Sequence, residues 1–532
     1  MLMRVNFYLG KMRQTRTFNT EGPCNPLKHY MVDALRGMGG ELSTLVEGGK
    51  YFVIHAARQS GKTTVLRSLA AKLIKTGKYY ALYCSLETLE GVDDAAVGIP
   101  AILDTVKNAL INYSMPKASS FGSEANMNAP YGALQSSFVA YCRSLDKPFV
   151  LLIDEADCLS GATLISFLRQ LRSGYVNRDD VPFIAALALT GMRDIRDYRN
   201  DYRQPSQTLG SSSPFNVVAA TMSLNNFTRD EIGMMYGQYT EETNRSFSED
   251  AVDFIWEQTQ GQPWLVNAIA RNALKLIKSD DFYSPINIDI ATVAVQSLIT
   301  GRETHFDSLA ARLHETRVQR IIEPIITGKK SAISRNSDDY GYVRDMGLIR
   351  DDKGQAEPAN PIYGEIIVRA LNRDVQEEID AQKYQIPVYI KNNAIDMDSL
   401  LCDFQIFWRE NEEIWHKKYD YQEAAPQLIL QAFLQRVING GGSISREMAA
   451  AAGRVDLCVA YCGNRYPIEL KIKRDESTYA KGVEQILSYM DKLGCKQGWL
   501  VIFDRSKNIP WDKKLYKRME VRGDNTVTVF GC

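Results

Sequence analysis

The sequence lacks several features that would assign it to a specialised class of protein. Its 532 residues contain no run of about 18 apolar residues, so we expect no membrane-spanning helix. Nine scattered cysteines form no C-x-x-C pair, which excludes a zinc knuckle and a disulfide framework and favours a reducing, cytoplasmic setting. Lysine and arginine (63) balance aspartate and glutamate (64), so the net charge of -1 gives no whole-chain attraction to nucleic acid or membrane. Any basic surface must therefore be local.

The pattern of apolar residues predicts a multidomain α/β protein with a parallel-sheet core. The length suffices for roughly three or four domains. Between residues 51 and 223, helical patterns alternate with five short apolar runs: YFVIHA, YYALYC, FVLLID, FIAALALT and NVVAAT. Such continuous runs, bounded by turn residues, are typical of a parallel sheet that is buried on both faces.

Changes of pattern along the chain predict six segments. Helical periodicity dominates after the core, and the last segment alternates helices with strands. The predicted segments are a lead-in (1–45), the α/β core (46–227), a helical region (228–300), helices with a small hairpin (301–375), a connector (376–420) and a C-terminal α/β domain (421–532).

The stretch HAARQSGKTT follows a predicted strand and precedes a helical pattern, which is the setting of a phosphate-binding loop. Backbone N–H groups of such a loop and the positive end of the helix cradle phosphates. We expect Lys62 to bridge the β- and γ-phosphates of ATP, Thr63 to place its hydroxyl on Mg²⁺, and Gly61 to allow close approach. Ala56 stands where the usual pattern has its first glycine, but its methyl group leaves the phosphate-facing amides in place. The other predicted nucleotide-binding residues of the loop are Arg58, Gln59, Ser60 and Thr64.

Two acidic residues follow the apolar run of FVLLIDEAD, at the carboxyl end of a predicted parallel strand, where ligands bind in open α/β sheets. We predict that Asp154 holds Mg²⁺ through water and that Glu155 orients the attacking water; helix capping by this pair is the alternative. The next strand ends at Thr190, a predicted polar sensor of the γ-phosphate. Arg193 is either a charge-stabilising residue or an ordinary surface arginine.

Six motifs together resemble the AAA+-related ATPases of the archaeal-ATPase and STAND type, over residues 16–375. The motifs are RTFNTEGPCNPLKHYMV, HAARQSGKTT, LLIDEAD, LTGMRD, SPFNV and TQGQPWLVNAIA. The resemblance implies an additional-strand P-loop core, a helical lid with Gly261-Gln262-Pro263 near the nucleotide, and Tyr30 or its neighbours against the adenine. It also implies a winged-helix-like domain over 301–375, whose expected recognition helix, SDDYGYVRDMG, is acidic. Acidic groups repel phosphates, so a packing or protein-contact role is favoured over direct reading of DNA.

The stretch RVDLCVAYCGNRYPIELKI predicts a hairpin in which charged residues interrupt an apolar pattern. A turn at Gly463-Asn464 would place Asp456 opposite Lys471. Because side chains alternate along a strand, Asp456, Glu469 and Lys471 emerge on one face. A buried charge is costly unless it is paired or binds a metal, which makes this face a candidate site.

The hairpin predicts a metal-dependent hydrolytic site. Its two carboxylates and the carbonyl of Leu470 are hard ligands of the kind that Mg²⁺ or Mn²⁺ prefers. Lys471 would position a water or stabilise the developing anion at a phosphodiester. The alternative is a cross-strand ion pair between Asp456 and Lys471 on a solvated face.

The D-x12-E-x-K spacing resembles the PD-(D/E)XK nuclease superfamily, which has a restriction-endonuclease-like α/β fold. The resemblance implies an extra acidic metal ligand near the helix before the hairpin, either Glu423 or its competitor Glu447. Gln485 and Tyr489 lie one helical turn apart and are similar to the Gln-x-x-x-Tyr pattern of RecB-type nucleases, which implies a role in positioning the substrate and the active site. The strand GWLVIF closes the fold.

The combined prediction is an ATP-binding and ATP-hydrolysing protein whose nucleotide state controls a Mg²⁺-dependent nuclease. The expected substrate is nucleic acid, with DNA preferred, in defence or DNA processing. One alternative is a STAND-like, nucleotide-switched signalling or DNA-binding protein whose nuclease-fold domain does not cut; another is an ATPase with a motor or loading role. The sequence does not decide whether the chain forms a homo-oligomer or whether a partner activates it.

Overall fold

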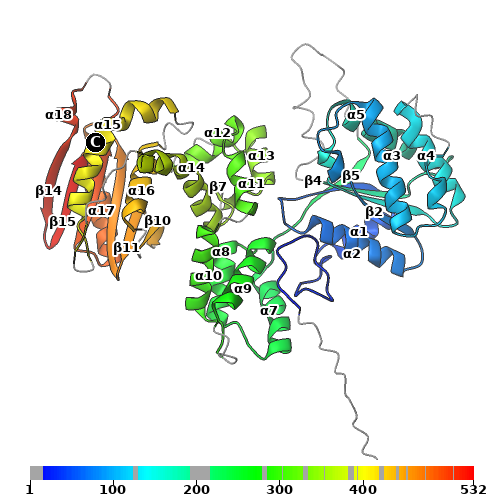
Figure 1. Cartoon of the computed structure of the whole chain (residues 1–532), viewed down its shortest axis with the longest axis horizontal. Helices are drawn as coiled ribbons and strands as arrows, with labels where there is room; N and C mark the ends of the chain where they lie inside the picture. Colours follow the sequence, from blue (N-terminus) through cyan, green and yellow to red (C-terminus); the bar gives the residue numbers. More distant parts are fainter. Residues whose placement is uncertain are drawn as a thin grey trace, which may run out of the picture. The chain divides into compact units, whose positions relative to one another are not determined.

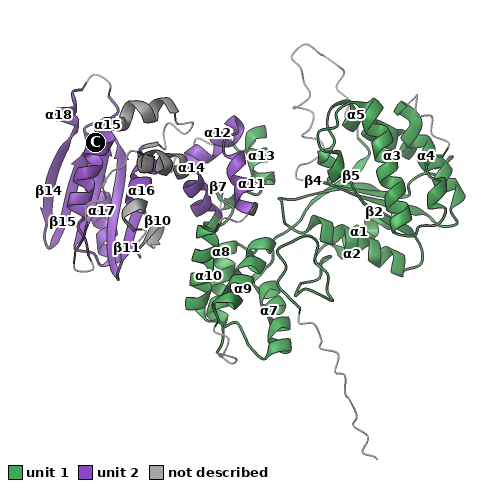
Figure 2. Cartoon of the chain, in the orientation of Figure 1, with its two compact units in different colours: residues 1–303, 334–362 green, residues 304–333, 363–532 purple. Residues whose placement is uncertain are grey.

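A computed structural model of the chain contains two compact units (Figures 1 and 2). Unit 1 comprises residues 1–303 with 334–362, and unit 2 comprises residues 304–333 with 363–532. The structure describes the chain outside residues 1–15, 124–129, 192–215, 278–283, 302–303, 327–333, 353, 382–388, 392–393, 419–424, 439–441, 451–452, 474 and 507–508.

Unit 1 is built on a five-stranded parallel sheet in the order β2-β3-β4-β1-β5, which confirms the predicted parallel-sheet core. All five predicted strands form. Strand β4 lies between the strand that precedes the P-loop and the strand that ends in the two acidic residues. The strands are β1 (Tyr51–His55), β2 (Tyr80–Ser85), β3 (Phe149–Asp154), β4 (Ala186–Gly191) and β5 (Val218–Ser223).

Helices cover both faces of this sheet. Successive side chains of each strand point to opposite faces, and the side chains on both faces are apolar. Tyr51 and Val53 pack with α3, α4 and α5, whereas Phe52 and Ile54 pack with α1 and α2. The helices are α1 (Gly39–Glu47), α2 (Lys62–Lys75), η1 (Glu87–Leu89), α3 (Ala95–Asn112), η2 (Ala118–Ser120), α4 (Pro130–Ser144), η3 (Ala156–Cys158) and α5 (Gly161–Val176).

The segment predicted as a helical lid, 228–300, follows β5 in unit 1 and is helical where it is described. A capping box begins its first helix: the side chain of Thr228 accepts from the N–H of Glu231, whose carboxylate accepts from the N–H of Thr228. Pro263 occupies the first turn of the third helix, where its missing N–H costs no hydrogen bond. The lid helices are α7 (Arg229–Thr243), α8 (Glu249–Thr259), α9 (Pro263–Leu276) and α10 (Ile288–Thr300).

The segment predicted as one winged-helix-like domain, 301–375, is divided between the two units. Residues 334–362 belong to unit 1 and contain the expected acidic helix and the small hairpin: α13 (Asp338–Asp345), β6 (Ile349–Asp352) and β7 (Gln355–Pro358). The other helices of the segment are α11 (Thr304–Arg312), α12 (Thr316–Ile326) and α14 (Pro361–Ala381).

Unit 2 contains a six-stranded mixed sheet in the order β10-β11-β12-β13-β15-β14. The pairs β12-β13 and β13-β15 are parallel and the others are antiparallel. The strands are β10 (Gly442–Ala450), β11 (Gly453–Tyr461), β12 (Asn464–Ile472), β13 (Gln497–Phe503), β14 (Tyr516–Arg522) and β15 (Asn525–Gly531). The remaining elements are β8 (Ile390–Lys391), β9 (Ala394–Ile395), α15 (Met397–Lys418), α16 (Ala425–Ile438), α17 (Ser477–Leu493) and α18 (Trp511–Lys514).

Helix α15 lies within the predicted connector but belongs to the core of this unit. Its buried Phe404 and Trp408 pack with Leu430 of α16 and with Leu457 and Ile468 of the sheet. The C-terminal domain therefore begins well before the predicted boundary at residue 421, because these apolar side chains need the sheet to be buried. Helix α17 covers the other face of the sheet. Within the described residues, every helix is too short or too polar to cross a membrane.

Candidate functional site

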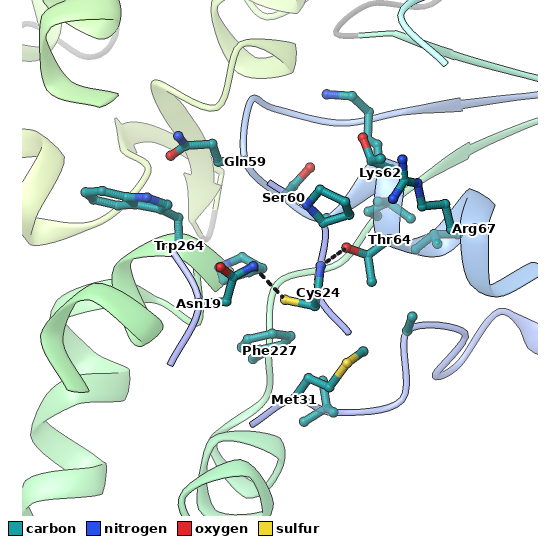
Figure 3. Close-up of a pocket in the computed structure, with 18 of the residues that line it drawn as sticks. Asn19, Cys24, Met31, Gln59, Ser60, Lys62, Thr64, Arg67, Phe227 and Trp264 are labelled. Carbon is teal, nitrogen blue, oxygen red and sulfur yellow. Dashed lines mark hydrogen bonds between the residues drawn. The ribbon is translucent and has the colours of Figure 1, made fainter. Parts of the chain in front are cut away.

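A cavity of about 830 Å³ lies in unit 1, where β1 and β3 end (Figure 3). Its walls come from the P-loop, from the N-terminal segment 19–38, and from the lid helices α7 and α9. Seven predicted nucleotide-site residues of the loop line it: Arg58, Gln59, Ser60, Gly61, Lys62, Thr63 and Thr64. Asp154 and Glu155 line it as well. The structure therefore brings together residues from two motifs that are about 90 positions apart in the sequence.

The P-loop conformation depends on positive backbone angles. Gly61 has φ 98 and directly precedes α2, where an L side chain would be strained. Gln59 also adopts a left-handed conformation, with φ 59. The hydroxyl of Ser60 donates to the carbonyl of Ala57 at 2.7 Å and closes the loop. The first N–H groups of α2 are thereby left at the cavity, as a phosphate site requires.

Lys62 is buried beneath the loop, with 5% of its surface exposed. Its Nζ donates to the carbonyl oxygens of Ala56 at 2.9 Å and Ala57 at 3.2 Å. Burial lowers the pKa of Lys62, and the nearby carboxylate of Glu155 opposes that shift. A phosphate bound at the loop would add negative charge beside the Lys62 ammonium and would favour its charged form.

Asp154 is the centre of a buried hydrogen-bond network. Thr63 Oγ1 donates to its Oδ2 at 2.6 Å, and Thr190 Oγ1 donates to its Oδ1 at 2.5 Å. Tyr83, within β2, donates its hydroxyl to Oδ2 at 3.1 Å. Only 1% of Asp154 is exposed, so these donors replace water around the carboxylate. The predicted residues of three separate motifs therefore converge, and Tyr83 joins them without having been predicted.

Glu155 follows β3 directly and has a left-handed backbone, with φ 54. Burial raises the pKa of its carboxyl, and the charge of Lys62 opposes the shift. A carboxylate with a raised pKa is better matched to proton transfer near neutral pH than an ordinary glutamate. Its position beside the cavity suits the predicted role in orienting water.

The N-terminal segment, predicted as a lead-in with Tyr30 or its neighbours near the adenine, forms a wall of the cavity. The backbone N–H of Cys24 donates to Thr64 Oγ1 at 3.1 Å, so the hydroxyl of Thr64 holds this segment (Figure 3). Trp264 of α9 donates its indole N–H to the carbonyl of Thr20 at 3.0 Å. Gln238 of α7 donates to the carbonyl of Met31 at 2.8 Å. The last two contacts join residues more than 200 positions apart, which local sequence patterns cannot reveal.

Tyr30, which was expected to contact adenine either itself or through its neighbours, is not among the residues that line the cavity. Only 1% of it is exposed, and its hydroxyl donates to Glu242 Oε2 at 2.9 Å. Its ring packs against Phe18, with centroids 4.9 Å apart. The neighbouring Met31 and Val32 line the cavity instead.

The Gly261-Gln262-Pro263 turn lies against the P-loop, as the resemblance implied. Gly261 has φ 72, and a Cβ atom there would lie 1.8 Å from the carbonyl oxygen of Phe227. Gln262 caps α9 by accepting from the N–H of Leu265, and its Nε2 is 3.5 Å from the carbonyl oxygen of Gln59. Only glycine fits the close approach at this turn.

Several predicted residues lie outside what the structure describes. Arg193 and Glu423 fall in segments whose placement is not described, and the side chains of Glu447 and Asp456 are likewise outside the described part of the chain. Their roles stay predictions.

The hairpin of unit 2 has a different turn from the predicted one. The central residues are Cys462 (φ 45) and Gly463 (φ 81), and Asn464 already pairs with Tyr461. A two-residue turn of this kind needs positive φ at both central positions, and Cys462 adopts it. Pairing runs from Tyr461–Asn464 to Leu457–Ile468, so the register differs from the one in which Asp456 would lie opposite Lys471.

Glu469 and Lys471 form an ion pair within β12, with Nζ 2.5 Å from Oε1. Glu469 is fully buried, and Lys471 retains a quarter of its side-chain exposure. Their neighbours in β13, Leu500 and Ile502, pack under α17, whereas Ile468 packs on the opposite face. The predicted shared face of Glu469 and Lys471 therefore exists, but it is covered by a helix. Lys471 has Glu469 as a partner, and the alternative of an Asp456–Lys471 pair stays a prediction because the side chain of Asp456 lies outside the described part of the chain.

The helix that covers this face carries the two other predicted residues. Gln485 Nε2 donates to the hydroxyl of Tyr489 at 3.2 Å, as expected for residues one turn apart. Gln485 is exposed, whereas Tyr489 is 4% exposed and packs with Ile486 in the core below. Leu470, whose carbonyl was the predicted metal ligand, packs its side chain on the far face.

Comparisons with known proteins gave the following results. A domain of unknown function (DUF8371) matches residues 405–507. No curated protein matches the chain. The Walker-type ATPase PABY2304 of Pyrococcus abyssi is similar over 66% of this chain and 99% of its own, with 14% identity and a TM-score of 0.46.

Two further solved structures are similar over about the same share of the chain. The Holliday junction branch migration motor RuvB of Thermotoga maritima covers 66% of this chain and 94% of its own, with 13% identity and a TM-score of 0.32. Cdc6p of Pyrobaculum aerophilum covers 63% of this chain and 94% of its own, with 15% identity and a TM-score of 0.35. Because these TM-scores are below 0.5, the chemistry of the site has to be inferred from its own residues.

Proposed function

We propose that the chain is an ATP-binding and ATP-hydrolysing P-loop protein whose nucleotide state controls a nuclease in its C-terminal domain. The observation that carries the ATPase part is the convergence of Lys62, Thr63, Asp154 and Thr190 beside one cavity. These residues come from three motifs, and their side chains are the types that phosphate and Mg²⁺ recognition require.

Each of these side chains has a role in ATP hydrolysis. The P-loop amides and Lys62 hold the β- and γ-phosphates, and Thr190 keeps Asp154 in place through its hydrogen bond. Glu155 takes a proton from water as the water oxygen bonds to the γ-phosphorus and the bond to ADP breaks. Its raised pKa suits this proton transfer.

The oxygen atoms beside the phosphates fit Mg²⁺. Thr63 Oγ1 and Asp154 Oδ2 are 2.6 Å apart, and both are hard oxygen donors. The ion would neutralise phosphate charge when bound. Thr63 would ligate it directly and Asp154 would act through water.

The nuclease part of the proposal is supported by the buried ion pair in β12. A fully buried carboxylate beside a mostly buried ammonium is costly to keep unless it has a function or strong compensation. Glu469 would supply a carboxylate suited to Mg²⁺ or Mn²⁺, and Lys471 would orient a water toward a phosphodiester of DNA. The elements around the pair follow the order expected from the resemblance: α16, the β11-β12 hairpin, α17 and β13.

The proposal is tested by a cleavage assay on plasmid DNA, linear DNA and RNA, with and without Mg²⁺, Mn²⁺ and ATP. We expect divalent-dependent cleavage that changes with ATP, and Lys471→Ala should abolish cleavage while ATP hydrolysis continues. The matched control is Lys496→Ala, which removes an exposed lysine whose partner, Asp524, is 91% exposed. Cleavage by Lys471→Ala at the wild-type rate would contradict the site assignment. ATP hydrolysis without cleavage of any substrate would favour the nucleotide-switched, non-cleaving alternative.

A further inference from the structure

Asn267 contributes a buried hydrogen-bond acceptor to the wall of the nucleotide cavity. It lies on α9, lines the cavity, and is 5% exposed. Its Nδ2 donates to the carbonyl oxygen of Pro263 at 2.8 Å. Because a carbonyl can only accept, this contact fixes the orientation of the amide and makes Oδ1 the free end.

The free end of this amide has no partner in the described part of the chain. Oδ1 is shielded from solvent, and no described donor lies within hydrogen-bonding distance. The amide of Asn19, at the same cavity, is satisfied at both ends: it donates to the carbonyl of Gly22 and accepts from the N–H of Glu21. A buried acceptor without a donor is unfavourable and points to a partner that the protein itself does not supply.

The residues around Asn267 indicate that it would face the base of a bound nucleotide rather than its phosphates. Pro263 and Trp264, on the preceding turn of α9, line the cavity together with Phe227 and Met31. Figure 3 shows Trp264 and Phe227 across the cavity from Lys62 and Arg67. The phosphates would lie at the Lys62 end of the cavity, so the purine ring would pack against the flat apolar side chains at the other end.

We propose that Asn267 Oδ1 accepts a hydrogen bond from the 6-amino group of adenine and so selects ATP over purine nucleotides with oxygen at position 6. This inference rests on the proposed binding of ATP at the cavity. Ionised phosphates only accept hydrogen bonds, so the 6-amino group and the ribose hydroxyls are the donors that ATP offers. A 6-oxo purine would place one acceptor against another, which is repulsive.

The test is an affinity series measured with the full chain by calorimetry: ATP, purine riboside triphosphate, inosine triphosphate and 2′-deoxy-ATP, each with Mg²⁺. We expect loss of the 6-amino group to weaken binding about five- to a hundred-fold, inosine triphosphate to bind more weakly still, and 2′-deoxy-ATP to bind like ATP. This series needs no variant and so does not depend on the folding of a mutant.

A substitution localises the effect. In Asn267→Leu, the affinities for ATP and purine riboside triphosphate should agree within about twofold, because the acceptor is gone. The matched control is Asn272→Leu, on the same helix, with 8% exposure and outside the cavity lining; it should keep the wild-type preference for ATP.

Two results would overturn the inference while leaving ATP binding intact. One is equal wild-type affinity for ATP and purine riboside triphosphate. The other is weaker binding of 2′-deoxy-ATP that Asn267→Leu abolishes, since that would make a ribose hydroxyl the donor. If the wild type binds no triphosphate at all, the proposed function fails together with this inference.

Discussion

Replacement of Glu155 by glutamine removes the proposed base without changing its size. The residue follows β3 with φ 54, a backbone conformation that glutamate and glutamine adopt equally. A general base contributes about 10²- to 10⁴-fold to a rate, which corresponds to about 3–5.5 kcal/mol of activation free energy. We therefore expect Glu155→Gln to hydrolyse ATP at least a hundred times more slowly than the wild type.

The same substitution should not weaken ATP binding. Glu155 places negative charge beside the phosphate site and opposes the lowered pKa of Lys62. Glutamine removes the repulsion between this carboxylate and the phosphates, so affinity should stay constant or increase. Equilibrium titration with a fluorescent ATP analogue measures this separately from hydrolysis.

The pH dependence gives an independent check. Burial raises the pKa of Glu155, and its ionised form is the active one. The wild-type rate should therefore fall as pH decreases through this raised pKa, above the ordinary value for glutamate, and Glu155→Gln should lack that acidic limb. Single-turnover phosphate release between pH 5 and 9 measures both profiles, with the exposed Glu90→Gln as control. Hydrolysis by Glu155→Gln within threefold of the wild type, or an unchanged acidic limb, would refute the reasoning.

Three further substitutions test the surroundings of the sites. Thr190→Val removes a buried donor to Asp154 and should cost about 1.5–3 kcal/mol of unfolding free energy in urea, together with most Mg²⁺-dependent hydrolysis; unchanged stability would contradict the network. Gly261→Ala places a Cβ atom 1.8 Å from the carbonyl oxygen of Phe227 and should destabilise unit 1 by more than about 2 kcal/mol, measured by thermal unfolding. In unit 2, burial acts to raise the pKa of Asp504. Hydrogen bonds from Lys473 and from the backbone N–H of Ser506 outweigh burial, so the pKa of Asp504 is lowered. Its ionised form therefore stabilises the fold above the ordinary aspartate pKa, and this contribution is lost as pH falls through the lowered value. Because the lysine is 45% exposed, Asp504→Asn should cost only about 1 kcal/mol at pH 7 and should reduce the loss of stability toward low pH.

The sheet of unit 1 could be predicted because its strands are buried on both faces. Runs such as FVLLID have no polar residue before the final aspartate, so neither the strand nor its end was ambiguous. The P-loop and the acidic pair were predictable for the same reason: each follows the carboxyl end of a strand in a parallel sheet. Strand β10, GSISREMAA, was not predicted, since it mixes small, polar and charged residues without regular alternation.

What the sequence could not provide was the set of contacts between distant segments. The bond from Trp264 to Thr20 and the bond from Tyr83 to Asp154 depend on how the chain packs, and neither has a local signal. Helix α15 did have one, because Phe404, Phe407 and Trp408 follow a helical spacing that predicts a buried face. The hairpin register was wrong because the turn lies one residue earlier than predicted. Gly463 and Asn464 both favour a turn, but the turn residues are Cys462 and Gly463, and Cys462 adopts positive φ.

A calorimetric titration of ATP into the full chain, with Mg²⁺ and with a chelator, measures nucleotide binding at the P-loop cavity directly. We expect one site per chain, stronger binding with Mg²⁺, and loss of binding in Lys62→Ala, whose folding is checked by thermal unfolding without nucleotide. Absence of binding by the wild type, or undiminished binding by a folded Lys62→Ala, would show that the cavity is not an ATP site.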